Sequence, residues 1–209
     1  MTRLHFFVAV LSACLLGACT DGDAPSQTEE IALNASTEKV RPTPDAASRG
    51  QSAVVVRLRS DGLNFEEQGP GPRSVVALDF GEDEQAAMEK LSTVFGKSQT
   101  GEDEDCGAGP ISHADFEVLL ANFSDGRFAG YVAKLAQGVE FAGRGNLDLA
   151  SARFEQLQSR ANAERIESTL DGEIVFAGSD GGRIGGFLDG RGDGAPLRAV
   201  FAGITCFYR

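Results

Sequence analysis

The stretch FEVLLANFSDGRFAGYV at residues 116–132 returns in similar form as EIVFAGSDGGRIGGFL at residues 173–188. In each stretch an apolar run leads to Ser-Asp-Gly and then to a second apolar run. Such runs have the composition of strands, and a glycine in the turn supplies the positive φ that a tight hairpin needs. We therefore expect two β-hairpins that belong to an internal repeat.

A helical pattern lies upstream of each hairpin. Before the first, apolar residues are spaced i, i+4 and i+7 at Ala87, Leu91 and Val94, and the acidic residues 82–84 occupy the first turn, where they favour the helix dipole. Before the second, the same spacing recurs at Ala150, Phe154 and Leu157, with Asn146 as the expected N-cap. Each unit is thus expected to contain one short amphipathic helix.

The fold class follows from these elements. Further strands are expected at residues 54–58, 75–78, 197–202 and 204–208. A short helix can bury its apolar stripe only against the neighbouring sheet. We therefore expect an α+β domain over residues 51–209, made of two tandem helix-plus-antiparallel-sheet units, about 51–136 and 137–209, with the helices on one side of the sheet.

The N-terminus has the pattern of an export signal. Met-Thr-Arg is followed by an apolar run from Phe6 to Leu16 and then by Gly17-Ala18-Cys19. Residues 16–19 resemble the lipobox of bacterial lipoproteins. The resemblance implies that residues 1–18 are a signal peptide and that Cys19 is the site of lipid attachment. The alternative, an uncleaved membrane anchor, is disfavoured because the run is shorter than the ~20 apolar residues of a spanning helix.

The same resemblance predicts a location in the cell envelope. Thr20 stands where the inner-membrane retention signal of the family usually has Asp, which favours the periplasmic face of the outer membrane. Residues 20–50 carry three prolines among small, polar and acidic residues, a composition typical of a disordered tether. The membrane is therefore an expected partner through the lipid anchor, with residues 19–50 as the link.

The charge of the chain limits its other partners. The formal net charge is −12 at pH 7. A negative surface repels phosphate backbones and anionic headgroups, so nucleic acid is excluded as an expected partner. Solubility explains the acidity, and steering toward a cationic partner is the alternative.

Two of the four cysteines are neither removed with the expected signal nor assigned to the lipid. Cys14 is removed with the signal and Cys19 carries the lipid, which leaves Cys106 and Cys206. In an oxidising compartment, such a pair most simply forms one disulfide. A reactive thiol or a metal site is the competing interpretation, but the chain has no Cys-x-x-Cys motif and His113 is its only histidine outside the signal.

Two further resemblances concern the mature chain. Phe80-Gly81, a helix with Ala87 and Leu91, Phe95-Gly96-Lys97 and two hairpin strands resemble the helix-sheet unit of SmpA/OmlA-type outer-membrane assembly lipoproteins. That unit occurs twice in proteins of the β-lactamase-inhibitor type, although the second copy here has Arg160-Ala161 in place of the closing glycine. Residues 106–110 and 205–207 also resemble uncharacterised alphaproteobacterial lipoproteins, which implies a disulfide and no activity.

Candidate catalytic residues are few. The chain lacks the Gly-x-Ser-x-Gly of a nucleophile elbow. Ser112, His113 and Asp115 have the right side chains for a triad, but triad members normally come from separate elements, so a local polar turn is the better interpretation. The acidic residues 102–105 lack the ligand spacing of a calcium loop. The sequence therefore predicts no catalytic residue, no metal site and no cofactor.

Three functions remain open, the third of which is a purely structural surface lipoprotein with no specific partner. The preferred hypothesis is a non-enzymatic, lipid-anchored envelope protein that binds another envelope protein through a sheet face or a hairpin edge. The alternative is a periplasmic hydrolase or small-ligand binder with a site between the two repeats. A buried, convergent polar cluster at the junction would favour the alternative, and an unbroken apolar junction would favour the first. The aromatic residues Phe128, Tyr131, Phe187 and Phe207 are all expected in the core.

Overall fold

The computed structural model describes residues 54–70, 72–135 and 139–207. The chain divides into two units, residues 1–46 and 47–209, and the described residues belong to the second. The expected signal peptide, the lipid site at Cys19 and the tether lie outside the described residues. Among the described residues, neither helix is both long and apolar enough to cross a membrane.

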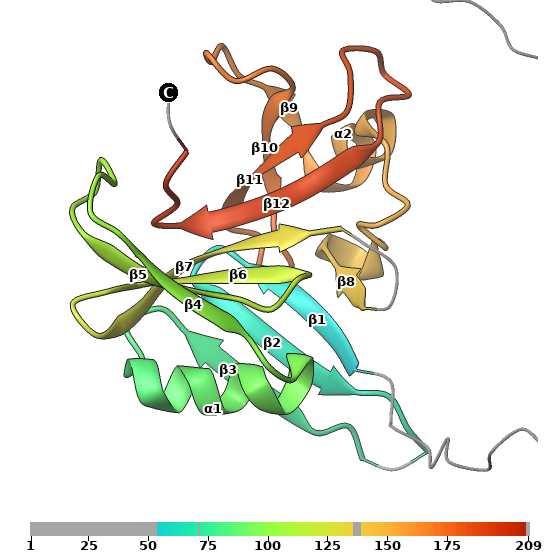
Figure 1. The fold of residues 1–209 in the computed structure, drawn as a ribbon. Helices are drawn as coiled ribbons and strands as arrows, with labels where there is room; N and C mark the ends of the chain where they lie inside the picture. Colours follow the sequence, from blue (N-terminus) through green and yellow to red (C-terminus); the bar gives the residue numbers. More distant parts are fainter. Residues whose placement is uncertain (1–53, 71, 136–138, 208–209) are drawn as a thin grey trace, which may run out of the picture. The chain divides into compact units, whose positions relative to one another are not determined.

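A small sheet begins the folded region (Figure 1). Its strand order is β3-β2-β1-β8, with β1 Val54–Arg59, β2 Gly62–Glu67, β3 Val75–Asp79 and β8 Glu140–Ala142. β1 and β2 form an antiparallel hairpin around Ser60-Asp61-Gly62, whereas β8 pairs with β1 in parallel. Ser-Asp-Gly thus occurs at a third hairpin turn, one that the sequence analysis did not identify.

A large antiparallel sheet contains the two stretches that open the sequence analysis. Its strand order is β4-β5-β6-β7-β12-β11-β10-β9. The strands are β4 Gln99–Asp103, β5 Ile111–Asp115, β6 Leu119–Ser124, β7 Arg127–Lys134, β9 Glu164–Arg165, β10 Glu173–Ala177, β11 Arg183–Leu188 and β12 Leu197–Gly203. The expected hairpins are β6–β7 and β10–β11, and β12 lies between them. The two expected units therefore share one continuous sheet.

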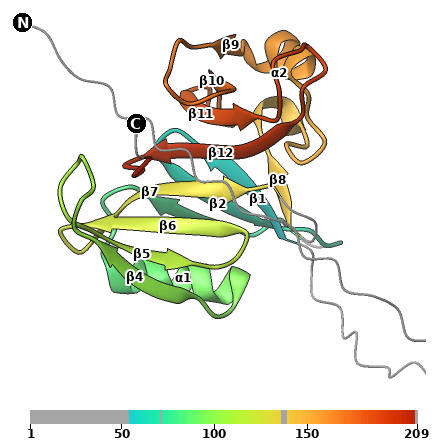
Figure 2. The ribbon, with the colours of Figure 1, turned by 45° about the horizontal axis from the view of Figure 1, so that its top comes forward.

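The first helix, α1 Glu84–Phe95, agrees with the sequence pattern. The Asp83 side chain caps it by accepting hydrogen bonds from the backbone N–H groups of Gln85 and Ala86. Ala87 and Leu91 are fully buried. Figure 2 shows α1 at the β4 end of the large sheet and α2 Phe154–Ala161 at the β9 end.

The second helix begins later than expected. Asn146 belongs to the short 3₁₀ helix η1 Arg144–Asn146 and has a positive φ, and the backbone N–H of Arg153 bonds to the Gln156 side chain at the start of α2. Ala150 precedes the helix because the segment before α2 packs against β8. There, the N–H of Leu149 donates to the carbonyl of Phe141 at 2.9 Å, and Leu149 is fully buried.

The strand expected at residues 204–208 is not formed over 204–207, and residue 208 lies outside the described residues. β12 ends at Gly203, whose φ of 72° turns the chain away from the strand direction. An alanine Cβ at this position would lie 2.2 Å from the carbonyl oxygen of Ala129. The chain therefore leaves the sheet at this glycine.

One hydrophobic core joins both sheets and both helices. It includes Leu58 from the small sheet, Tyr131 and Val200 from the large sheet, Leu91 from α1 and Leu157 from α2. These side chains are fully buried. The domain is therefore α+β with a predominance of strands.

Polar contacts fasten the two sheets to each other at the hairpin turns. The buried hydroxyl of Tyr131 donates to the carbonyl of Arg59 at 2.8 Å. The Ser60 hydroxyl donates to the Asp180 carboxylate at 2.6 Å, and the N–H of Ser179 donates to the carbonyl of Leu58 at 2.8 Å. The β1–β2 turn is thus docked on the β10–β11 turn.

Candidate binding surface on the large sheet

The large sheet has one face in the core and one face partly open. Successive side chains of a strand point to opposite faces. Ala133 and Val200 are paired across β7 and β12 and are buried in the core. Val132 and Phe201, the next pair in the register, are only partly buried. We call the face that carries Val132 and Phe201 the outer face.

Three phenylalanines form an aromatic cluster on the outer face. The ring centroids of Phe187 and Phe201 are 5.0 Å apart, and Phe207 lies 5.0 Å from Phe187 and 4.9 Å from Phe201. Gly185 makes room for this arrangement, because a Cβ there would lie 2.2 Å from the Phe201 ring. Phe128, Tyr131 and Phe187 are buried as expected, although Phe187 packs on the outer face, whereas Phe207 is only partly buried there.

Residues 204–207 cross the outer face, and we call them the C-terminal strap. The N–H of Ile204 donates to the carbonyl of Ala129 at 2.9 Å, and the Asn122 side chain donates to the carbonyl of Ile204 at 2.8 Å. Gly130 permits this close approach, since a Cβ there would lie 2.2 Å from the Ile204 oxygen. The strap is thus seated directly on the backbone of β7.

The structure joins Cys106 to Cys206 as a disulfide, with the Cα atoms 5.3 Å apart. Cys106 lies in the connection between β4 and β5, and Cys206 lies in the strap. The separation of the Cα atoms is within the range that a disulfide spans without backbone movement. The covalent link fixes the end of the strap, and with it Phe207, over the sheet.

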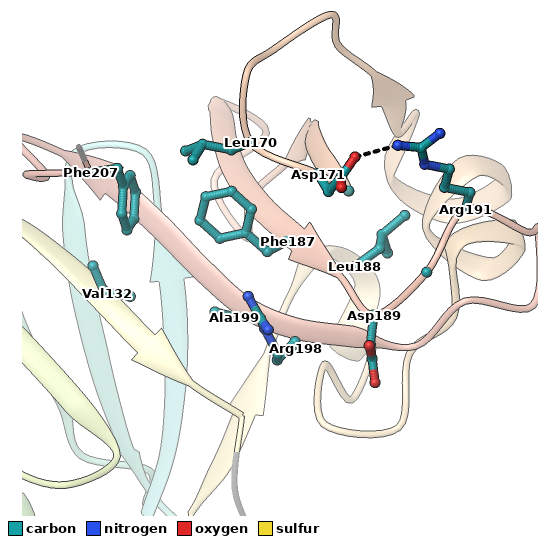
Figure 3. A pocket seen from close by; sticks show the side chains of 12 residues that line it. Val132, Leu170, Asp171, Phe187, Leu188, Asp189, Arg191, Arg198, Ala199 and Phe207 are labelled. Atoms are coloured by element: carbon teal, nitrogen blue, oxygen red, sulfur yellow. Dashed lines mark hydrogen bonds and ion pairs between the residues drawn. The ribbon is translucent and has the colours of Figure 1, made fainter. Parts of the chain in front are cut away.

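A pocket of about 620 Å³ lies between the aromatic cluster and two loops (Figure 3). Its floor is apolar, formed by Val132, Phe187, Ala199 and Phe207, with Leu170 beside it. Its rim is charged, with Asp171, Asp189, Arg191 and Arg198. The volume is in the range of sites that take small molecules or single side chains.

An irregularity in strand pairing places a cation at this rim. Phe187 pairs with Ala199 and the next residue, Leu188, pairs with Leu197, so Arg198 is an extra residue in β12. Such a bulge redirects a side chain relative to the regular alternation. Arg198 is exposed and borders the pocket, although regular alternation would point it into the core with Val200.

The remaining charged residues of the rim differ from Arg198 in whether they are paired and where they point. Arg191 forms an ion pair with Asp171 at 2.5 Å, and both side chains are more than four-fifths exposed. An exposed pair of this kind contributes little to stability. In Figure 3 the Asp189 carboxylate points away from the Phe187 ring. Within the described part of the chain, no hydrogen bond or ion pair engages the side chain of Arg198.

A smaller cavity of about 140 Å³ adjoins the pocket at the strap. It is bordered by His113 and Asn122 on the sheet and by Cys206 and Phe207 on the strap. Val132 and Phe207 border both cavities. The strap therefore divides the space over the outer face into two compartments.

The structure does not assemble the triad residues into a site. The Ser112 hydroxyl donates to the Glu84 carboxylate of α1 at 3.2 Å. His113 lies on the opposite face of β5, over Gly101, where a Cβ would be 2.7 Å from its Nε2 atom. Asp115 accepts from Lys134 at 2.8 Å. Although Ser112 and His113 both border a cavity of about 580 Å³, their side chains cannot form a nucleophile–base pair across the strand.

Two other groups of charged residues lie outside the pocket. Residues 102–105 lie at the end of β4 and in the following turn, and in the described ranges no set of three or more His, Cys, Asp or Glu side chains could hold a metal ion. On the small sheet, Arg57 is hydrogen-bonded to Glu66. This bond lowers the pKa of the Glu66 carboxyl against the opposing effect of burial, and it raises the pKa of the Arg57 guanidinium.

A site between the two repeats was one of the expected possibilities, but its residues could not be named because they come from separate parts of the chain. Val132, residues 170–172, residues 187–191, residues 198–199 and Phe207 meet only through strand pairing and the strap. Core packing was the expected role of Phe187 and Phe207. The sequence feature that could have indicated close packing here is the pair of glycines at 185 and 186, because glycine is unusual inside a strand.

Comparison with known proteins adds no assignment. No protein-family model matches the chain, no curated protein matches it in sequence, and no solved structure matches its fold.

Proposed function

We propose that the chain is a bacterial envelope lipoprotein that binds another envelope protein through the outer face of its large sheet. The lipobox pattern at residues 16–19 supports the anchor, with lipid on Cys19 and residues 19–50 as the tether. The absence of Asp after Cys19 supports the outer membrane as its location. A multiply acylated cysteine gives a stable membrane attachment, whereas one chain binds only marginally.

The observation that carries the binding role is the open aromatic surface. Phe201 and Phe207 remain partly exposed beside a pocket of about 620 Å³. Aromatic side chains in pockets are common anchors of protein interfaces because they bury much area at low entropic cost. Among the described residues, the large sheet has no second layer over this part of its outer face other than the strap.

The junction between the two hairpins favours binding over hydrolysis. β7 and β12 meet there, and their core-facing side chains are apolar except for Tyr131, whose buried hydroxyl donates to the carbonyl of Arg59. Among the described residues, the other buried polar or charged side chains are Asn122 and Glu173. They lie in β6 and β10, with three strands between them, so they do not converge on one site. The tandem pseudo-repeat remains part of this proposal, as a duplication that placed one hairpin on each side of β12.

Affinity isolation from envelopes tests the binding role. The lipidated protein is compared with Arg198→Glu, which reverses a charge at the pocket, and with Arg183→Glu, which makes the same change on β11 outside the pocket. We expect one partner to be recovered with the unmodified chain and with Arg183→Glu but to be depleted with Arg198→Glu. Equal recovery with all three proteins, or no enriched protein with any of them, would contradict the proposed role.

Fractionation tests the anchor. We expect the unmodified protein in the membrane fraction, with a mass increased by lipid at residue 19, and Cys19→Ser in the soluble periplasmic fraction or as uncleaved precursor. Cys14→Ser is the matched control and should behave as the unmodified protein. Membrane attachment that survives Cys19→Ser in a cleaved chain would rule out the lipid anchor.

A further inference from the structure

We propose that the outer-face pocket receives the C-terminal residue of a partner protein, with an apolar side chain on the phenylalanine floor and its carboxylate on Arg198. This inference rests on the proposed binding role and names the chemistry of the partner. The pocket would recognise an apolar, preferably aromatic, group next to a free carboxylate, whether it belongs to a protein C-terminus or to a small molecule.

The floor selects an apolar side chain. The pocket opens onto the face of the sheet, where the backbone groups of β7, β12 and β11 are already engaged in strand pairing. An occupant therefore cannot join as an additional strand and must bind through its side chain. Phe187, Phe207 and Val132 offer it an apolar surface with two ring faces or edges, against which an aromatic group packs favourably.

The rim selects a carboxylate. Arg198 is aimed at the pocket by the bulge and engages no partner in the described part of the chain. A guanidinium can hold a carboxylate through two parallel hydrogen bonds. Of the two acidic rim residues, Asp171 is paired with Arg191, and Asp189 points away from Phe187 in Figure 3. Arg198 is therefore the charge available to an occupant lying on the floor.

The boundaries of the pocket favour a chain end over a continuing segment. Phe207 closes one side and is held in place by the disulfide at Cys206. The Asp171–Arg191 ion pair stands above the other side (Figure 3). The pocket volume of about 620 Å³ suits one or two residues.

The chain contains no tryptophan, so tryptophan probes give a signal free of protein background. The probes are N-acetyltryptophan, which has the carboxylate, and N-acetyltryptophanamide, which has the same ring without the charge. The protein is the chain from residue 19 with Cys19→Ser and the disulfide intact. Binding is measured by fluorescence anisotropy and by the blue shift of the probe emission.

We expect N-acetyltryptophan to bind about two- to fivefold more tightly than the amide, because an exposed guanidinium–carboxylate pair contributes a factor of about this size. Arg198→Gln should remove this preference and leave the weak binding of the amide unchanged. Arg183→Gln is the matched control and should bind both probes as the unmodified protein does. Equal binding of the two probes, no binding, or a preference that survives Arg198→Gln would overturn the inference.

Peptides distinguish a protein C-terminus from a free small carboxylate. Gly-Ser-Gly-Trp with a free carboxylate should bind at least as well as N-acetyltryptophan, and the same peptide with an amidated end should not. If N-acetyltryptophan binds and the free-acid peptide does not, a chain end is excluded as the occupant. Partner recovery that depends on the pocket without any binding of these probes would refute this inference and leave the proposed function standing.

Discussion

Replacing both Cys106 and Cys206 by serine removes the covalent link that holds the C-terminal strap across the large sheet. The two cysteines are 100 residues apart in the sequence. For a loop of this length, constraint of the unfolded chain contributes about 4–5 kcal/mol to the free energy of unfolding. Since domains of this kind are stable by about 5–15 kcal/mol, this one bond supplies about a third or more of the margin.

The C-terminal strap also adds to the free energy of unfolding through the packing of Phe207, by less than the disulfide does. Its ring contacts Phe187 and Phe201, and each aromatic pair is worth about 0.5–1.5 kcal/mol beyond buried area. In the double serine variant, the hydrogen bonds at Ile204 still hold the beginning of the strap, but Phe207 is released. Phe207→Leu in the disulfide-bonded chain separates this contribution, with an expected cost of about 1–3 kcal/mol.

The assay is urea unfolding followed by far-ultraviolet circular dichroism. The double variant should lose about 5–8 kcal/mol in total, and its unfolding should show a larger m-value because the unfolded chain without the link exposes more surface. The unmodified protein in excess reductant should match the double variant. A difference below about 1 kcal/mol between the oxidised protein and the double variant would refute this reasoning.

Three other substitutions test the packing. Asp180→Asn should cost about 1 kcal/mol at pH 7, since the carboxylate accepts charge-assisted hydrogen bonds. Burial acts to raise the pKa of Asp180, but bonds from the Ser60 hydroxyl and from backbone N–H groups lower it below its usual value. The stabilisation by the Asp180 carboxylate is therefore complete above about pH 4 and is lost as pH falls through the lower pKa of the folded state. The loss of unfolding free energy caused by Asp180→Asn, measured by urea unfolding, should therefore be smaller at pH 3 than at pH 7. An equal loss at both pH values would contradict the contact. Leu91→Ala should cost about 2–5 kcal/mol by thermal unfolding, because its side chain is fully buried, and a cost below 1 kcal/mol would place α1 outside the core. Gly130→Ala should displace the strap and weaken binding of N-acetyltryptophan, whereas Gly192→Ala, which meets nothing within 4 Å, should leave binding unchanged.

Local chemistry made the hairpins predictable. Ser-Asp-Gly between apolar runs specifies a tight turn, and both expected hairpins, β6–β7 and β10–β11, are confirmed. α1 was also predictable, because the acidic residues 82–84 and the spacing of Ala87 and Leu91 are local signals, although the helix begins only at Glu84, with Asp83 as its N-cap. β2 was missed although Ser60-Asp61-Gly62 has the same turn sequence.

Features that depend on distant contacts were not predictable from one sequence. The start of α2 is set by the packing of Leu149 near Phe141 rather than by a capping residue at Asn146. The parallel pairing of β8 with β1 joins segments with about eighty residues between them and has no local signature. The candidate site likewise depends on a bulge at Arg198, where strand periodicity alone would place the side chain in the core.

The central claim, that the outer face meets a partner in the envelope, is tested most directly by photo-crosslinking in living cells. A photoreactive amino acid is placed at Leu170, beside the pocket, or at Thr93, on the exposed side of α1. We predict one adduct of defined mass from position 170 that disappears with Arg198→Glu, and no such adduct from position 93. Identical adducts from both positions, or none from position 170, would contradict the claim.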